Sequence, residues 1–296
     1  MTRLELRDRS VLITGAAGGI GTALAAQLVD RGARVGLLDL PGHGLTQLEA
    51  RLGSAAFAVP VDLRDRDAVL TATDTVAERL GPPVAAVLGA GVVRPDPLLQ
   101  QSEADARLVI DVNLYGTLWS LQAVAPYVAQ TGGHVLALSS VAGIAPIPLS
   151  GVYPATKAAI DNMVTQTRVE WMHTPASAGT VRLSFVDTPM AQTVRDDPRA
   201  GRAIRRSPSR LTRASTPDDA ARAIVGGLER RAHVVTVPRW QAPAGWPQTL
   251  AHSVAEAIFR RTSLRFEVPG GRDADPQGTE LRTTDAPTHP ERGPDR

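Results

Sequence analysis

The feature that most constrains the fold is a regular alternation of two kinds of segment along the chain. Short apolar runs, typical of strands, alternate with longer segments whose apolar residues follow the period of a helix. The expected strands are 10–14, 34–39, 57–61, 84–89, 134–138, 181–186 and 233–237. The expected helices are 20–31, 45–52, 65–80, 103–130, 152–173 and 217–231. Strands that are apolar on both faces and separated by helices predict an α/β fold with a doubly wound parallel sheet.

No shift in composition divides residues 10–237, so we expect one domain over residues 6–240. Inside it, residues 188–216 are polar and rich in arginine, too long for an ordinary connection, and therefore a candidate lid. Residues 241–268 contain Leu250, Val254 and Ile258 at helical spacing, which predicts an amphipathic helix packed on the domain or on a partner subunit; a membrane-surface helix is the alternative. Residues 269–296 have too few large apolar side chains to fold and predict a disordered tail.

Composition excludes several classes of protein. The 296 residues include no cysteine, which rules out disulfides, thiolate catalysis and cysteine-bound metal centres, and we expect no metal site. The net charge of +2 is too balanced to predict nucleic-acid binding. The chain has no run of 18 apolar residues and lacks the apolar core of a signal peptide at its start. We therefore expect a soluble cytoplasmic protein without membrane contact.

A glycine-rich turn follows the first expected strand and precedes the first expected helix. Glycines at such a turn let the backbone approach a pyrophosphate, whose charge is stabilised by the free N–H groups at the helix N-terminus. The residues assigned to this contact are Gly15, Ala17, Gly18, Gly19, Ile20 and Gly21. Asp39 ends the second strand, where a carboxylate accepts hydrogen bonds from ribose hydroxyls and repels a 2′-phosphate, so NAD is favoured over NADP. Asp62 ends the third strand and is placed at the adenine edge.

Tyr153 and Lys157 are four residues apart and share one face of the expected helix. Lys157 is the only lysine among 32 basic residues, and the chain has three tyrosines. Chance alone is therefore a poor explanation for a lysine four residues after a tyrosine. A nearby ammonium favours the phenolate and is expected to lower the pKa of the tyrosine from about 10, which makes the phenol a usable acid or base.

The glycine turn and the Tyr-x-x-x-Lys pair together resemble the short-chain dehydrogenase/reductase family, over about residues 6–240. The resemblance implies a Rossmann domain with a seven-stranded parallel sheet, a homodimer or homotetramer, and a secondary alcohol or ketone as the small-molecule substrate. It implies that Tyr153 exchanges a proton with the substrate and that Lys157 assists it and binds the nicotinamide ribose. It also implies that Ser140 orients the substrate oxygen and that Asn113 holds the helix backbone and a water. The remaining positions assigned to the cofactor are Leu63, Gly89, Ala90, Gly91, Val186 and Thr188.

The chain departs from the family pattern at two strand ends. The fourth strand ends in Gly89-Ala90-Gly91 where the family has Asn-Asn-Ala-Gly, which implies weaker cofactor binding or weaker anchoring of the sheet. The sixth strand leads to Thr188 without the family's Pro-Gly pair. These losses raise a second hypothesis, a nucleotide-binding sensor or scaffold with little or no turnover. Quenching of NADH fluorescence without reduction of any ketone would favour the sensor over the enzyme.

Apolar residues follow the fourth and fifth expected strands, which suits a lipophilic substrate such as a steroid, retinoid or acyl compound. The arginines of residues 195–213 allow an alternative, an anionic substrate such as a coenzyme A ester, although a solvated loop explains them as well.

Overall fold

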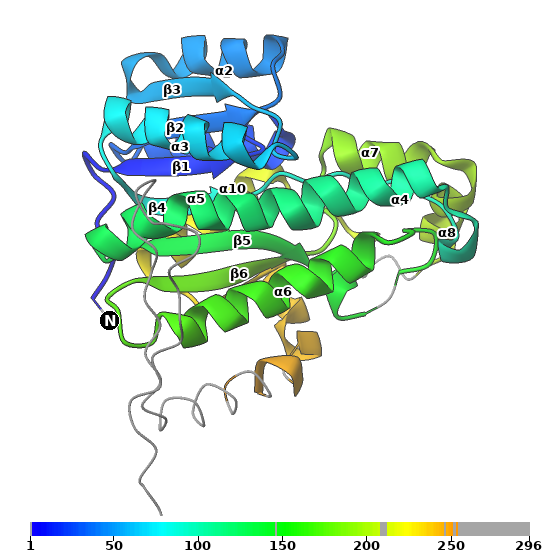
Figure 1. The fold of residues 1–296 in the computed structure, drawn as a ribbon. Helices are drawn as coiled ribbons and strands as arrows, with labels where there is room; N and C mark the ends of the chain where they lie inside the picture. Colours follow the sequence, from blue (N-terminus) through cyan, green and yellow to red (C-terminus); the bar gives the residue numbers. More distant parts are fainter. Residues whose placement is uncertain (1, 146, 208–211, 246, 251–252, 254–296) are drawn as a thin grey trace, which may run out of the picture.

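The computed structural model describes residues 2–145, 147–207, 212–245, 247–250 and 253. Seven strands form one parallel sheet with the order β3-β2-β1-β4-β5-β6-β7, which confirms the predicted fold class (Figure 1). The strands are β1 (Ser10–Thr14), β2 (Arg34–Asp39), β3 (Ala56–Pro60), β4 (Pro83–Leu88), β5 (His134–Ser140), β6 (Ser177–Leu183) and β7 (Val234–Val237). Every residue of the central strands β1, β4 and β5 is buried, as a sheet covered on both faces requires.

Helices cover both faces of this sheet (Figure 1). The helices are α1 (Gly19–Val29), α2 (His43–Leu52), α3 (Arg66–Leu80), α4 (Glu103–Ile110), α5 (Gly116–Thr131), α6 (Tyr153–Glu170), α7 (Pro189–Asp196), α8 (Pro198–Arg206) and α10 (Pro217–Glu229). One buried apolar cluster joins the sheet to α1, α2 and α10, and a second joins its other face to α3, α5 and α6. The turn between β1 and α1 and the start of α6 therefore lie at the same edge of the sheet, where the strands end.

Two sequence predictions are wrong in detail. The sixth strand begins at Ser177 and ends at Leu183, instead of spanning residues 181–186, because small residues such as Gly179 and Thr180 continue the strand in the buried sheet. The chain leaves the sheet after Leu183, and Val186 forms only an isolated bridge to Ser215.

The single helix expected over residues 103–130 is interrupted. A π-helical turn, Asp111–Tyr115, separates α4 from α5, and it is one residue per turn wider than the helices around it. Such turns commonly mark functional positions, and Asn113 lies at the centre of this one.

The candidate lid contains two helices, α7 and α8, and its residues 208–211 lie outside the described part of the chain. In the C-terminal segment, residues 241–245 belong to a 3₁₀-helix, Arg239–Gly245, and residues 247–250 and 253 are α-helical; most of the expected amphipathic helix and all of the expected tail, 269–296, lie outside the described residues. Among the described helices, none combines the length and the apolar character needed to cross a membrane.

Candidate active site

The glycine turn brings the end of β1 close to the end of β4. Gly15 has a φ of +70°, a conformation that favours glycine, and a Cβ on this residue would lie 2.8 Å from both the N and the Cα of Ala90. A Cβ on Gly21 would collide with the carbonyl oxygen of Gly15. The turn therefore requires glycine at both positions, which leaves its backbone open to a close-fitting ligand.

The N-terminus of α1 and the Asp39 carboxylate complete this turn. Gly18 is the N-cap of α1 and supplies no side chain to its first N–H groups. Asp39 lies at the end of β2, where Oδ2 accepts a hydrogen bond from Ala17 N and Oδ1 accepts one from Leu40 N, both at 2.8 Å. The uncapped helix end suits a pyrophosphate, and the cradle of glycines leaves the space that such a group needs. These residues fit a dinucleotide.

Thr14 anchors the end of β4, where the family's asparagines are missing. Its hydroxyl accepts hydrogen bonds from Gly89 N at 3.1 Å and from Ala90 N at 3.4 Å, and its carbonyl accepts a third from Gly89 N at 3.1 Å. A side chain of β1 thus holds the backbone that continues β4.

Asn113 anchors Val92, two residues further along this segment. From the π-helical turn its side chain accepts a hydrogen bond from Val92 N at 2.7 Å and donates one to Val92 O at 3.0 Å. The Asn113 amide also donates to the Thr156 hydroxyl at 3.2 Å, which ties the turn to α6. Asn113 is completely buried, and a Cβ on Gly91 would lie 3.2 Å from its Oδ1 and 3.4 Å from Lys157 Nζ. Gly91, Asn113 and Lys157 therefore meet at one point.

Lys157 lies on the buried face of α6, one turn after Tyr153. Its ammonium donates a hydrogen bond to Leu138 O at 2.8 Å and lies 5.6 Å from the centre of the Tyr153 ring. Burial lowers the pKa of Lys157 to about 8, although the charge of Asp161 acts in the opposite direction. The lysine therefore carries a proton that it can release within the ordinary pH range.

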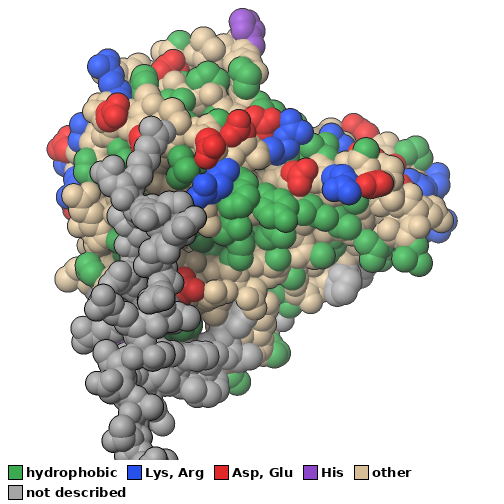
Figure 2. All heavy atoms as spheres, in the orientation of Figure 1, with side chains coloured by type: hydrophobic (Ala, Val, Ile, Leu, Met, Phe, Trp, Pro, Cys, Tyr) green, Lys and Arg blue, Asp and Glu red, His purple; other side chains and the backbone are tan. Residues whose placement is uncertain are grey.

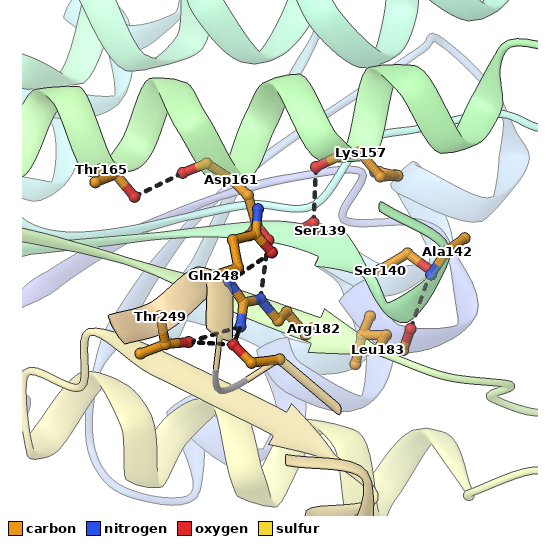
Figure 3. Close-up of polar contacts among 11 residues, drawn as sticks. Ser139, Ser140, Ala142, Lys157, Asp161, Thr165, Arg182, Leu183, Gln248 and Thr249 are labelled. Atoms are coloured by element: carbon orange, nitrogen blue, oxygen red, sulfur yellow. Dashed lines mark hydrogen bonds and ion pairs between the residues drawn. The ribbon is translucent and has the colours of Figure 1, made fainter. Parts of the chain in front are cut away.

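Ser140 is the last residue of β5 and its side chain is buried. Its hydroxyl donates to Leu183 O and accepts from Ala142 N, both at 3.1 Å (Figure 3). The same hydroxyl acts on Tyr153 in the direction that lowers the pKa of the phenol. The tyrosine, the lysine and the serine are thus brought together at the carboxyl ends of β4 and β5.

The expected direction of the Tyr153 pKa is not what the structure gives. Burial is the largest influence and raises the pKa above its usual value of about 10, and the effect of the Ser140 side chain opposes this only in part. The sequence argument considered the charge of Lys157 and left out the desolvation of the phenol. Tyr153 is therefore a neutral phenol at pH 7.

The other residues assigned to the cofactor have different surroundings. Thr188, the N-cap of α7, lies against the glycine turn, because a Cβ on Gly19 would be 3.0 Å from Thr188 Cγ2. Asp62 instead binds the side chain of Arg64, which lowers the pKa of the Asp62 carboxyl. Leu63 and Val186 are buried.

Sequence reasoning missed several residues that hold this site. Thr14 and Thr156 have the roles described above, and Ser139 Oγ donates to the backbone oxygen of Lys157 at 2.9 Å (Figure 3). An ion pair between Asp161 of α6 and Arg182 of β6 joins the helix that carries Tyr153 to the sheet. A detectable signal existed for this pair: an acidic residue one turn after Lys157, and one arginine in an otherwise uncharged strand.

Residues 9–199 match the sequence profile of the family described as short chain dehydrogenase. The chain belongs to the short-chain dehydrogenase family. A match over this length includes the glycine turn, the π-helical turn and the start of α6.

Relatives within the short-chain dehydrogenases differ in what they act on. An uncharacterised oxidoreductase of Listeria monocytogenes is 32% identical over 200 residues, which are 65% of this chain and 80% of the relative. A cis-4-hydroxycyclohexanecarboxylate dehydrogenase of Sinomonas cyclohexanicum is 32% identical over 222 residues, 73% of this chain and 88% of the relative. The crystal structure of levodione reductase has a TM-score of 0.71 and 26% identity, and covers 78% of this chain and 96% of its own. The family is thus an oxidoreductase family with varied substrates.

Proposed function

We propose that this short-chain dehydrogenase interconverts a secondary alcohol and a ketone with NAD as the hydride carrier. The observation that carries the proposal is the junction of Tyr153, Ser140 and Lys157. Ser140 acts on the phenol in the direction that lowers its pKa, and the Lys157 ammonium lies 5.6 Å from the centre of the Tyr153 ring. An acid, a polar anchor and a cation at one point provide the groups that proton transfer to a substrate oxygen needs.

In the direction of reduction, Tyr153 donates its proton to the oxygen that was the ketone carbonyl. Burial raises the pKa of the phenol, so the proton is present at pH 7 and available for transfer. Ser140 holds the substrate oxygen beside the phenol and stabilises its developing charge. The Lys157 ammonium stabilises the tyrosinate that remains, and the reverse steps apply to oxidation. Reduction is therefore favoured near pH 7, and oxidation rises with pH.

The glycine turn, the N-terminus of α1 and Asp39 would hold the dinucleotide. When bound, its nicotinamide supplies or accepts the hydride at the substrate carbon. Asp39 would receive the ribose hydroxyls, and its negative charge at the end of β2 repels a 2′-phosphate. This charge supports NAD over NADP.

A lipophilic substrate is supported by apolar side chains at the strand ends. Leu98, Ile147 and Met190 follow β4, β5 and β6 and are 60%, 39% and 38% exposed. The alternative of an anionic substrate loses support at two lid arginines. Arg195 and Arg199 form ion pairs with Asp187 and Asp96, both at 2.8 Å, so their charges are already matched.

The proposal includes a homodimer or homotetramer. Figure 2 shows apolar side chains gathered over α5 and flanked by charged ones. At the start of this helix the exposed Tyr115 stacks on Trp119, with ring centres 5.7 Å apart. An apolar surface of this kind suits contact with a second copy of the chain.

The test is an assay of purified protein with NADH and NADPH against a panel of cyclic, aliphatic and aromatic ketones. We expect the protein to reduce at least one lipophilic ketone with NADH. We expect the rate of this reduction to fall by about 10²-fold or more in Tyr153→Phe. The matched control is Tyr127→Phe, which removes a phenol bonded to Asp74. We expect turnover of this variant to match the original protein.

The proposal would be contradicted if the protein binds NADH but neither reduces any ketone nor oxidises any alcohol. That result would favour the sensor hypothesis. A turnover that Tyr153→Phe leaves intact would remove Tyr153 from the mechanism.

A further inference from the structure

A buried ion pair joins α6, the helix that carries Tyr153 and Lys157, to strand β6. Arg182 belongs to β6, in which all seven residues are buried, and its side chain is 3% exposed. Its Nε donates to Oδ2 of Asp161 on α6 at 2.8 Å, and the Asp161 side chain has no exposed surface (Figure 3). A charged group in such a place is costly unless it is paired, so each residue depends on the other.

The remaining guanidinium nitrogens of Arg182 bind the C-terminal segment. Nη1 donates to Thr249 Oγ1 at 3.0 Å, and Nη2 donates to Gln248 Oε1 at 3.3 Å (Figure 3). Nη1 also lies 3.5 Å from Gly245 O. Arg182 therefore has fixed partners on both sides, Asp161 on one and Gln248 and Thr249 on the other, which leaves the Asp161 carboxylate little freedom to move.

The same carboxylate lies one helical turn after Lys157. Residues four apart on a helix are neighbours on one face, and the charge of Asp161 raises the pKa of the lysine, the direction that favours its ammonium. The second oxygen of Asp161, Oδ1, is buried and accepts no hydrogen bond from any residue that the structure describes. One oxygen is thus fixed by Arg182, while the other is not held by any described residue.

The groups around Lys157 offer no substitute for Asp161. Besides Lys157, the titratable groups on α6 are Tyr153, Asp161, Arg168 and Glu170, of which the last two lie eleven and thirteen residues after Lys157, and Arg182 lies beyond Asp161 on β6. The packed segments contribute the Leu138 carbonyl and the Asn113 amide, which do not titrate. Burial opposes the charge on Lys157, and Asp161 is the anion that offsets this effect.

We infer that Asp161, held in place by Arg182 and through it by Gln248 and Thr249, is a positioning residue that keeps Lys157 protonated for proton transfer at Tyr153. The inference rests on the proposed function for its role in turnover, whereas its electrostatic part concerns Lys157 alone. It gives the C-terminal segment a part in the site, because this segment fixes the arginine that fixes the carboxylate.

The single lysine of the chain allows a direct test. Growth with ¹³C,¹⁵N-lysine labels one side chain, and its NMR signal followed against pH reports the pKa of Lys157 in the full-length protein without any substrate. We expect Asp161→Asn to lower this pKa by about one unit or more, and Asp161→Glu to restore most of it. An unchanged pKa in Asp161→Asn would overturn the inference.

Two further variants make the result decisive. Asp161→Asn leaves the Arg182 charge buried without its partner, so the double variant Asp161→Asn/Arg182→Gln removes both charges in case the single variant does not fold. We expect the lysine pKa to fall in the double variant as well. Asp219→Asn is the matched control, because it breaks an exposed pair with Arg222 at 2.7 Å on α10 and should leave Lys157 unchanged.

The pH profile of turnover separates this inference from the proposed function. If wild-type protein reduces ketones, we expect the pH break that belongs to Lys157 to move down in Asp161→Asn. A purely structural role would lower the rate at all pH values without moving the break. Absence of turnover in the wild type would contradict the proposed function, while the NMR titration would still decide the role of Asp161.

Discussion

At the scale of single residues, the site is defined by how little space surrounds Lys157. Its ammonium has one hydrogen-bond acceptor, Leu138 O at 2.8 Å, and a Cβ on Gly91 would be only 3.4 Å away. The chain has arginine at its other basic positions, which makes the one lysine conspicuous. An ammonium is compact enough for this position, whereas a guanidinium is larger, planar and has a fixed set of donors.

We predict that Lys157→Arg keeps the fold and the net charge but lowers kcat for ketone reduction by about 10²-fold or more, because the larger group cannot occupy the same space. Steady-state kinetics with NADH measure kcat, and circular dichroism checks that the fold is kept. Arg222→Lys on the exposed side of α10 is the control and should leave kcat unchanged. Turnover of Lys157→Arg near the wild-type rate would disprove the role of Lys157.

At the scale of elements, two irregular turns place the functional groups. The π-helical turn Asp111–Tyr115 directs the Asn113 side chain to Val92, and a regular helix would not present the same face at this position. The turn after β1 places Gly15 against the backbone of Ala90. Neither arrangement follows from helical or strand periodicity, because both depend on a departure from it.

We predict that Gly15→Ala destabilises the protein by about 1–3 kcal/mol and abolishes NADH binding, since a side chain at φ +70° is strained and would collide with Ala90. Urea unfolding and an NADH fluorescence titration measure these effects. Gly42→Ala is a suitable control, because a Cβ there meets nothing within 4 Å and the residue has an extended backbone with φ 169°. The prediction is wrong if the two variants behave alike.

At the scale of the whole molecule, a buried histidine links two strands at the edge opposite the site. His134 begins β5, is completely buried, and its Nδ1 lies 2.8 Å from Ser177 Oγ of β6. Burial, together with the charges of Arg231 and His233, lowers its pKa to about 3. An unfolded chain has a histidine pKa of about 6.5, so acid favours unfolding through this residue.

Between pH 6.5 and about 3, the unfolded state binds a proton at His134 that the folded state does not. The contribution of His134 to the free energy of unfolding is therefore fully present above pH 6.5. It falls as the pH decreases, by about 2 kcal/mol between pH 7 and pH 5. We predict that His134→Gln removes this part of the pH dependence in urea unfolding. His43→Gln, at an exposed position, should retain it. Equal pH dependence in wild type and His134→Gln would refute the prediction.

The sequence by itself determined the fold class, the glycine turn and the pairing of Tyr153 with Lys157, and the family resemblance added Ser140 and Asn113. These are local patterns: apolar periodicity, glycines between a strand and a helix, and residues one helical turn apart. Where they failed, the reason was also local, since the small residues of β6 look unlike a strand until neighbouring strands bury them.

Only the tertiary structure decided which groups meet and what their surroundings do to them. The direction of the Tyr153 pKa depends on burial, which no spacing reveals. The contacts of Thr14 with Gly89, and of Asp161 with Arg182, join residues 75 and 21 positions apart. Electrostatics and hydrogen bonding act through space, so the partner of a buried charge is known only once the sheet and its helices are assembled.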